Sequence, residues 1–141
     1  MKKEIAQQIA RFLNEYNKLD KFFTLNDIIA EQDNYLYILD DNDILIGAVR
    51  LIKFDWYLGG IKHLTVNEKY RKKGYGVKLL KKAEHSAINR KIRVLQSTIR
   101  SKDIASIKCF EKCGFKRVNC FYNKRTKRNI LIYQKVLSQC E

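Results

Sequence analysis

The chain has 141 residues, 45% of them hydrophobic, and a formal net charge of +14. That length can bury one hydrophobic core, so we expect a single domain over residues 1–141. No apolar stretch approaches the length of a membrane span, and charged residues interrupt the N-terminal segment where a signal peptide needs an unbroken apolar block. These features exclude a membrane-spanning class and predict a soluble, cytoplasmic protein.

The excess of 29 Lys and Arg over 15 Asp and Glu has two interpretations. A basic surface attracts an anionic partner, such as a nucleotide cofactor, a nucleic acid or an acidic surface. Alternatively, the lysine-rich composition reflects coding bias and most of the lysines form a solvated surface. The charge alone does not decide between the two.

The four cysteines lack the paired spacing of a zinc site, and a cytoplasmic chain keeps its cysteines reduced. Cys109 and Cys113 share one face of a predicted helix, which makes a metal pair conceivable. Free cysteines more often act as small buried hydrophobic residues, so we expect no metal site.

Two helices are predicted at the N-terminus. Apolar residues recur at helical spacing from Ile5 to Tyr16, which indicates an amphipathic helix. Thr24 and Asp27 have the spacing of a capping box, so a second, shorter helix is expected over residues 25–30.

A strand-rich block follows. The runs YLYIL and ILIGAVRLI are separated by DDND, whose short polar side chains suit a hairpin turn, so the two runs are expected to pair antiparallel. A third run, IKHLTV at residues 61–66, follows two glycines and extends the meander.

Beyond the third strand the pattern changes from hairpins to crossovers. The predicted elements are a helix over 77–88, a strand over 92–99, a helix over 103–113 that ends at Gly114, and strands over 115–125 and 129–137. The order predicts a mixed α/β, α+β-like fold, with a central, mostly antiparallel sheet of about six strands and about four flanking helices.

The segment RKKGYG lies between the third strand and the following helix. Free N–H groups at a helix start and the helix dipole favour an anion, and Gly74 and Gly76 let a phosphate approach the backbone. Arg71, Lys72 and Lys73 add ionic contacts at the rim. The segment fits neither the nucleoside triphosphate motif GxxxxGK[ST] nor the dinucleotide motif GxGxxG. It therefore predicts a phosphate site of another kind.

Residues 61–115 resemble the core of the GNAT superfamily of N-acetyltransferases. The matching parts, in chain order, are LTV, RKKGYG, VKLLKKAEHSAI, RVLQSTI and ASIKCFEKCGF. The resemblance implies acetyl-CoA as co-substrate and a sheet in which one parallel pair of strands splays apart. The usual first strand of the family is expected to be absent, because the predicted first helix starts almost at residue 1.

The resemblance also implies where acetyl-CoA binds. The loop and helix start would hold its pyrophosphate through Arg71, Lys72, Lys73, Gly74, Tyr75, Gly76 and Val77. The backbone of Leu64, Thr65 and Val66 would pair with the pantetheine arm like an extra strand. Near the cofactor would lie Asp103, Ser106 and Phe110, although Asp103 and Ser106 also fit a plain helix cap.

Phe110 stands where many family members carry a tyrosine that protonates the departing thiolate. A thiol titrates at about pH 8.5, whereas general acid catalysis contributes roughly 10²–10⁴-fold, so a slower enzyme is expected to remain functional. Tyr122 or Tyr133, on the closing strands, is an alternative hydroxyl donor.

His63 precedes the glycine loop at a position where family members often carry a glutamate, and its pKa range suits a general base. A packed or solvated histidine is the alternative. Asp55, Trp56 and Tyr57 lie in the preceding turn, where they are expected to position an acceptor amine. His85 is expected at the surface.

The leading prediction is an N-acetyltransferase that transfers an acetyl group from acetyl-CoA to a primary amine by direct attack in a ternary complex, as a monomer or homodimer. Two alternatives stay open. The first is a CoA-binding module with weak or no catalysis, which the loss of the tyrosine hydroxyl at Phe110 suggests. The second is an RNA-directed basic protein that uses KRTKR at residues 124–128 and the cluster from Arg90 to Arg93.

Overall fold

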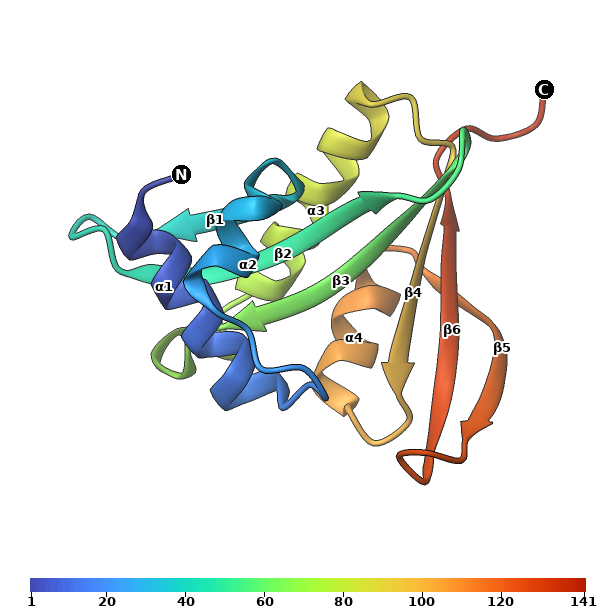
Figure 1. Ribbon diagram of the computed structural model, residues 1–141. Helices are drawn as coiled ribbons and strands as arrows, with labels where there is room; N and C mark the ends of the chain where they lie inside the picture. The colour runs from blue at the N-terminus through green and yellow to red at the C-terminus, as the bar shows by residue number, and fades with distance from the viewer.

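The computed structural model describes residues 1–141 and shows one six-stranded sheet with helices on both faces (Figure 1). The elements are α1 (Lys3–Phe12), α2 (Leu25–Ala30), β1 (Tyr35–Leu39), β2 (Leu45–Lys53), β3 (Leu58–Val66), α3 (Tyr75–Asn89), β4 (Val94–Arg100), α4 (Ile104–Lys112), β5 (Lys116–Asn123) and β6 (Arg128–Val136). The predicted fold class is confirmed. No helix is both long and apolar enough to cross a membrane.

Helices α1 and α2 lie on one face of the sheet, and α3 and α4 lie on the other (Figure 1). A short π-helical segment, Leu13–Asn17, extends α1. The predicted capping box starts α2: the Asp27 N–H donates to the Thr24 hydroxyl at 3.3 Å, and the Thr24 N–H donates to the Asp27 carboxylate at 2.8 Å. The local sequence therefore determines where α2 begins.

Strands β1 and β2 form the predicted antiparallel hairpin. In its turn the Asp40 carboxylate accepts from the N–H groups of Asn42 and Ile44 at 2.8 and 2.9 Å. Strand β3 begins earlier than predicted, because Gly59 and Gly60 lie inside it. A Cβ at Gly60 would lie 2.2 Å from the Phe54 ring, so a side chain there would require this half-exposed ring to move.

The sheet order is β1-β2-β3-β4-β6-β5, and the β3–β4 pair alone is parallel. These two strands pair only from Leu58 opposite Val94 to Gly60 opposite Gln96, and then they diverge (Figure 1). At the point of divergence the Ser97 hydroxyl donates to the Ile61 carbonyl at 2.9 Å. The expected splayed parallel pair is thus present, and it opens a wedge in the middle of the sheet.

A β-bulge interrupts the pairing of β3 with β2. Ala48 pairs with Thr65 and Arg50 pairs with Lys62, so His63 and Leu64 together lie opposite the single residue Val49. His63 has a φ of 57°, in the left-handed region that residues other than glycine rarely adopt. The bulge turns the His63 side chain toward the face that α1 and α2 cover, where it meets Tyr35.

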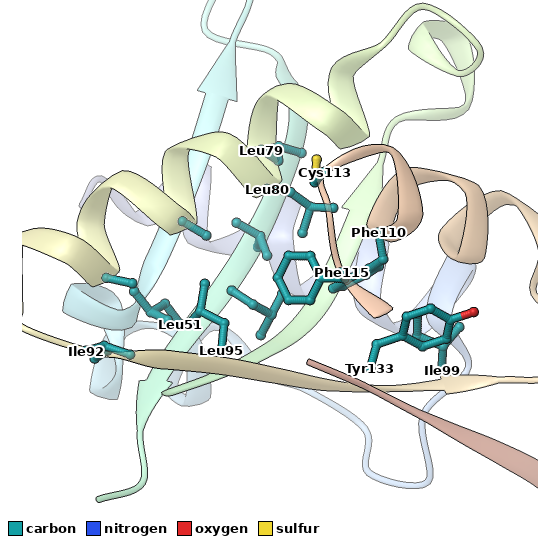
Figure 2. Packing of buried hydrophobic residues seen from close by; sticks show 14 of the residues in the cluster. Leu51, Leu79, Leu80, Ile92, Leu95, Ile99, Phe110, Cys113, Phe115 and Tyr133 are labelled. Atoms are coloured by element: carbon teal, nitrogen blue, oxygen red, sulfur yellow. The ribbon is translucent and has the colours of Figure 1, made fainter. Parts of the chain in front are cut away.

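The larger apolar cluster fills the space between the sheet and the helices α3 and α4. Figure 2 shows Leu80 of α3 and Leu95 of β4 directed toward the Phe115 ring. The rings of Phe110 and Phe115 meet edge to face, with centroids 5.0 Å apart. This packing fixes the position of α4 relative to the wedge between β3 and β4.

Gly76 allows α3 and α4 to approach closely. It is buried, and a Cβ at this position would lie 2.8 Å from the Cys109 sulfur of α4. The sequence interpretation assigned Gly74 and Gly76 the same role of giving a phosphate access to the backbone. In the structure Gly76 faces a helix, so its lack of a side chain serves helix packing.

We expect Gly76→Ala to lower the free energy of unfolding by about 1–3 kcal/mol, because the added methyl group overpacks the helix contact. In the Gly76→Ala, Cys109→Ala double variant most of this loss should be recovered, since the remaining contact to the residue 109 Cβ is 3.8 Å. Urea unfolding of the wild type, both single variants and the double variant measures the coupling free energy between residues 76 and 109. Strictly additive effects of the two substitutions would contradict this explanation.

Candidate functional site

A cavity of about 310 Å³ opens where β3 and β4 diverge. Residues 61–64 of β3 and 97–100 of β4 form two of its walls. The start of α4 forms a third, and residues after α1 close the fourth. The cavity therefore joins segments from both ends of the sequence around the break in the sheet.

The edge of β3 that faces the cavity has no strand partner beyond Gly60. The Leu64 carbonyl on this edge accepts from the Asn17 side-chain amide at 3.2 Å, and the Val66 carbonyl accepts from Arg71 Nε at 3.2 Å. In an extended strand the N–H and C=O of one residue point the same way, so the Val66 N–H also faces away from β2. An extended molecule can pair with such an edge as an added strand does.

Thr65 differs from its two neighbours. Its backbone faces β2, where it pairs with Ala48, and its side chain is buried with no hydrogen-bond partner for the hydroxyl. The structure thus places Leu64 beside the cavity and Val66 on the same strand edge, whereas Thr65 lies between them with its polar groups turned elsewhere.

The glycine loop leads from β3 into α3. Gly74 occupies the N-cap position of α3 with a φ of 86°, and no side chain caps the helix. A Cβ at Gly74 would meet no atom within 4 Å, so the space in front of the helix start is open. The first N–H groups of α3, at Tyr75, Gly76 and Val77, lack intrahelical acceptors and can bind an anion.

Three exposed cations, Arg71, Lys72 and Lys73, surround this helix start. Arg71 lies 4.5 Å above the Tyr16 ring, and Lys73 lies 5.8 Å from the Tyr70 ring centroid. None of the four salt bridges in the structure involves these cations. Their charge is therefore available to an anionic ligand.

Asp103 and Ser106 line the cavity, but they bind each other. The Asp103 carboxylate accepts from the Ser106 N–H at 3.1 Å and from its hydroxyl at 2.8 Å, and it caps α4. Phe110 lies one turn further along α4, is 2% exposed and also reaches the cavity. The wall that α4 supplies is thus a helix cap followed by an aromatic ring that has no hydroxyl.

His63 lies on the cavity wall, and its Nδ1 is 3.1 Å from the Tyr35 hydroxyl. The Phe23 ring packs against the imidazole edge to face, with centroids 5.0 Å apart. Burial, together with the positive charges of Arg50, Lys62 and Lys21, lowers the pKa of His63 to about 4. Burial raises the pKa of Tyr35 to about 12. Both side chains are therefore uncharged at neutral pH.

The other sequence-predicted residues lie away from the cavity. Asp55, Trp56 and Tyr57 form the turn between β2 and β3, whereas the cavity opens beyond Gly60 along β3. Tyr122 is exposed on β5, the outer strand, and Tyr133 is buried with its hydroxyl donating to Glu111 at 3.3 Å. His85 is exposed on α3. The structure thus brings neither the turn nor these two tyrosines to the cavity.

Nothing in the sequence indicated that the segment after α1 lines the cavity. Tyr16 and Asn17 line the cavity, and the Arg100 guanidinium of β4 holds this segment by donating to the Asn17 carbonyl at 3.1 Å. From its spacing in the sequence, Tyr16 is expected on the apolar face of the first helix. The π-helical segment and the left-handed residue Lys18 reorient the chain here, and no sequence motif indicated this change.

The cysteines lie apart from any cluster of metal ligands. Cys113 is buried beside α3, Cys109 packs against Gly76, and both remain free thiols. No group of three or more His, Cys, Asp or Glu side chains is positioned to hold a metal ion.

Several solved structures of acetyltransferases have a similar fold. An N-acetyltransferase from Staphylococcus aureus Mu50 is 22% identical, with a TM-score of 0.83, over 98% of this chain and 96% of its own. A ribosomal-protein-alanine N-acetyltransferase from Brucella melitensis is 17% identical, with a TM-score of 0.82, over 97% of both chains. A GNAT family acetyltransferase from Elizabethkingia anophelis with acetyl-CoA bound is 18% identical, with a TM-score of 0.70, over 89% of this chain and 88% of its own.

None of the curated proteins compared with the sequence matches it. The family comparison is decisive, because the acetyltransferase (GNAT) family matches residues 4–115, which include α1, the divergent strands, the glycine loop and α4. The chain therefore belongs to the GNAT family of acetyltransferases.

Proposed function

We propose that the chain is an acetyl-CoA-dependent N-acetyltransferase that acetylates a primary amine by direct attack in a ternary complex. One observation carries this proposal: an edge of β3 that has no strand partner leads directly to an uncapped helix start surrounded by cations. That arrangement suits a ligand with an extended polar arm at one end and phosphates at the other.

The residues fit acetyl-CoA at both ends. Acetyl-CoA supplies an acetyl group activated as a thioester. Leu64 and Val66 offer backbone groups to its pantetheine arm, and the loop from Arg71 to Val77 offers N–H groups and cations to its pyrophosphate. The open space at Gly74 supports close approach of a phosphate to the backbone, since no side chain or neighbouring segment fills it.

His63 is proposed to accept the proton of the attacking amine. Because its pKa is about 4, the imidazole is neutral at physiological pH and has one unprotonated nitrogen. A base of such low pKa takes up the proton only once attack on the thioester has made the amine nitrogen acidic. If the ring proton is on Nδ1 and is donated to the Tyr35 oxygen, the Nε2 lone pair is free to act on the amine directly or through a water molecule.

The developing oxyanion is proposed to be stabilised by a backbone N–H of β3 in the segment from Leu64 to Val66, next to the bulge. Phe110 provides no proton for the departing thiolate. Because a thiol titrates at about pH 8.5, the CoA thiolate can leave without a general acid, although more slowly.

The CoA-binding module with weak or no catalysis remains the main alternative, because Phe110 lacks a hydroxyl.

The RNA-directed alternative requires two basic clusters, residues 124–128 and Arg90 to Arg93, to act together. In the structure these clusters lie at opposite ends of β6. Residues 124–127 form the turn between β5 and β6 and Arg128 begins β6, whereas the Arg93 carbonyl accepts from the Leu137 N–H beyond the end of β6. Within the first cluster Arg125 is paired with Asp20. The two clusters therefore do not form one surface.

We expect Gly74→Glu to weaken acetyl-CoA binding at least about tenfold, because the carboxylate would occupy the open space and repel phosphate. Calorimetric titration of the wild type and the variant measures the effect. Gly74→Ala controls for backbone strain at positive φ, and Lys82→Gln, on the exposed side of α3, controls for the change in net charge. If the wild type fails to bind acetyl-CoA, the proposed function is wrong.

Catalysis is tested by incubating the wild type with acetyl-CoA and a broad panel of primary amines and measuring the release of free thiol. We expect thiol release that depends on the amine, with an acetylated product of matching mass. His63→Gln should reduce kcat by roughly 10²-fold, the lower end for loss of a general base, with unchanged acetyl-CoA affinity. Acetyl-CoA binding without thiol release for any amine would favour the CoA-binding module.

The partly buried position of His63 has a separate consequence for stability. Its pKa of about 4 in the folded chain lies below the ordinary value of 6.5, so as pH falls below 6.5 the unfolded chain takes up the proton first. We expect the wild type to lose stability relative to His63→Gln as pH falls from 6.5 toward 4, with a constant difference above 6.5. Urea unfolding across this range tests it, and a wild type that gains relative stability on acidification would contradict it.

A further inference from the structure

Three large aromatic side chains are exposed at the turn between β2 and β3. Phe54 is 50% exposed, Trp56 is 73% exposed and Tyr57 is 37% exposed. The Trp56 and Tyr57 rings are neighbours, with centroids 5.2 Å apart, and the turn lies outside the cavity. This grouping of exposed rings is therefore explained neither by the hydrophobic core nor by the proposed donor site.

The fold brings a basic segment against this turn. The N–H groups of Arg93 and Val94 both donate to the Tyr57 carbonyl, at 2.8 and 2.9 Å. Lys53, at the end of β2, donates to the Arg90 carbonyl at 3.4 Å. The loop between α3 and β4 is thus bound to the aromatic turn, although the two segments are far apart in the sequence.

The charge of this region is almost entirely positive. Arg90, Lys91 and Arg93 come from the loop, and none of the salt bridges in the structure involves them. Lys62 lies 5.6 Å from the Phe54 ring centroid. The single acidic residue of the turn, Asp55, accepts from the Trp56 N–H at 2.7 Å. The loop therefore brings cations without salt bridges to the region of the exposed rings, and the Arg90 guanidinium also donates to the Leu51 carbonyl at 3.4 Å.

We propose that this region, the Trp56 surface, binds single-stranded nucleic acid. It is defined by Phe54, Trp56, Tyr57, Arg90, Lys91 and Arg93. Bases stack on exposed aromatic rings, and phosphates pair with adjacent cations, which is the combination that single-stranded nucleic acids require. An acidic peptide would use the cations but would leave the rings without a matching partner. The proposal does not depend on acetyl transfer.

Trp56 provides a direct test, because it is the only tryptophan in the chain. We expect titration with a short single-stranded RNA of mixed sequence to quench its fluorescence, with a parallel rise in the anisotropy of labelled RNA. Binding should weaken as salt increases, because phosphate contacts release counterions. Absence of both signals at low salt would overturn the proposal.

Variants distinguish RNA binding at the Trp56 surface from non-specific attraction of RNA to a basic protein. We expect Trp56→Ala to weaken RNA binding about tenfold or more, and Lys91→Gln with Arg93→Gln to weaken it and reduce its salt dependence. The matched control is Lys124→Gln with Arg128→Gln, which removes the same charge from the far end of β6. An equal effect of both double variants, or displacement of RNA by polyglutamate at equal charge concentration, would overturn the proposal. Circular dichroism and acetyl-CoA titration of each variant distinguish loss of folding or of the donor site from loss of this surface.

Discussion

The separation of β3 from β4 is the constraint on which the rest of the site depends. The two parallel strands share pairing only as far as Gly60 opposite Gln96. Immediately beyond, the Ser97 hydroxyl donates to the Ile61 carbonyl, so a side chain takes the place of a ladder hydrogen bond at the point where the strands part. Because backbone groups in a protein interior need partners, a strand edge left free in this way is suited to pair with an extended ligand.

The chain stabilises this opening from both faces of the sheet. On one face α4 is fixed by the Phe110 and Phe115 rings and by its close contact with α3 at Gly76. On the other, the segment after α1 is held by hydrogen bonds from Arg100 to the Asn17 carbonyl and from Asn17 to the Leu64 carbonyl. The cavity is therefore bounded by elements that contacts within the chain hold in place.

The positive charge is divided among separate regions that have different structural surroundings. Around the start of α3, Arg71 and Lys73 lie against tyrosine rings beside open backbone, which suits phosphate at a fixed point. At the Trp56 surface the cations lie beside rings that face solvent, which suits a flexible polyanion with aromatic bases. At the turn before β6, Arg125 is already paired with Asp20. Net charge alone could not distinguish these three environments.

The amino-acid sequence by itself determined the order of the elements, the capping box at Thr24, the hairpin turn at Asp40 and the glycine loop, because each depends on local spacing and backbone preference. It did not indicate that Gly76 packs against Cys109, that His63 meets Tyr35 across a bulge, or that Asn17 reaches β3. Nor did it indicate that Trp56 lies outside the cavity between β3 and β4. These relationships join residues far apart in the chain, so only the tertiary structure, through strand register and helix packing, decided them.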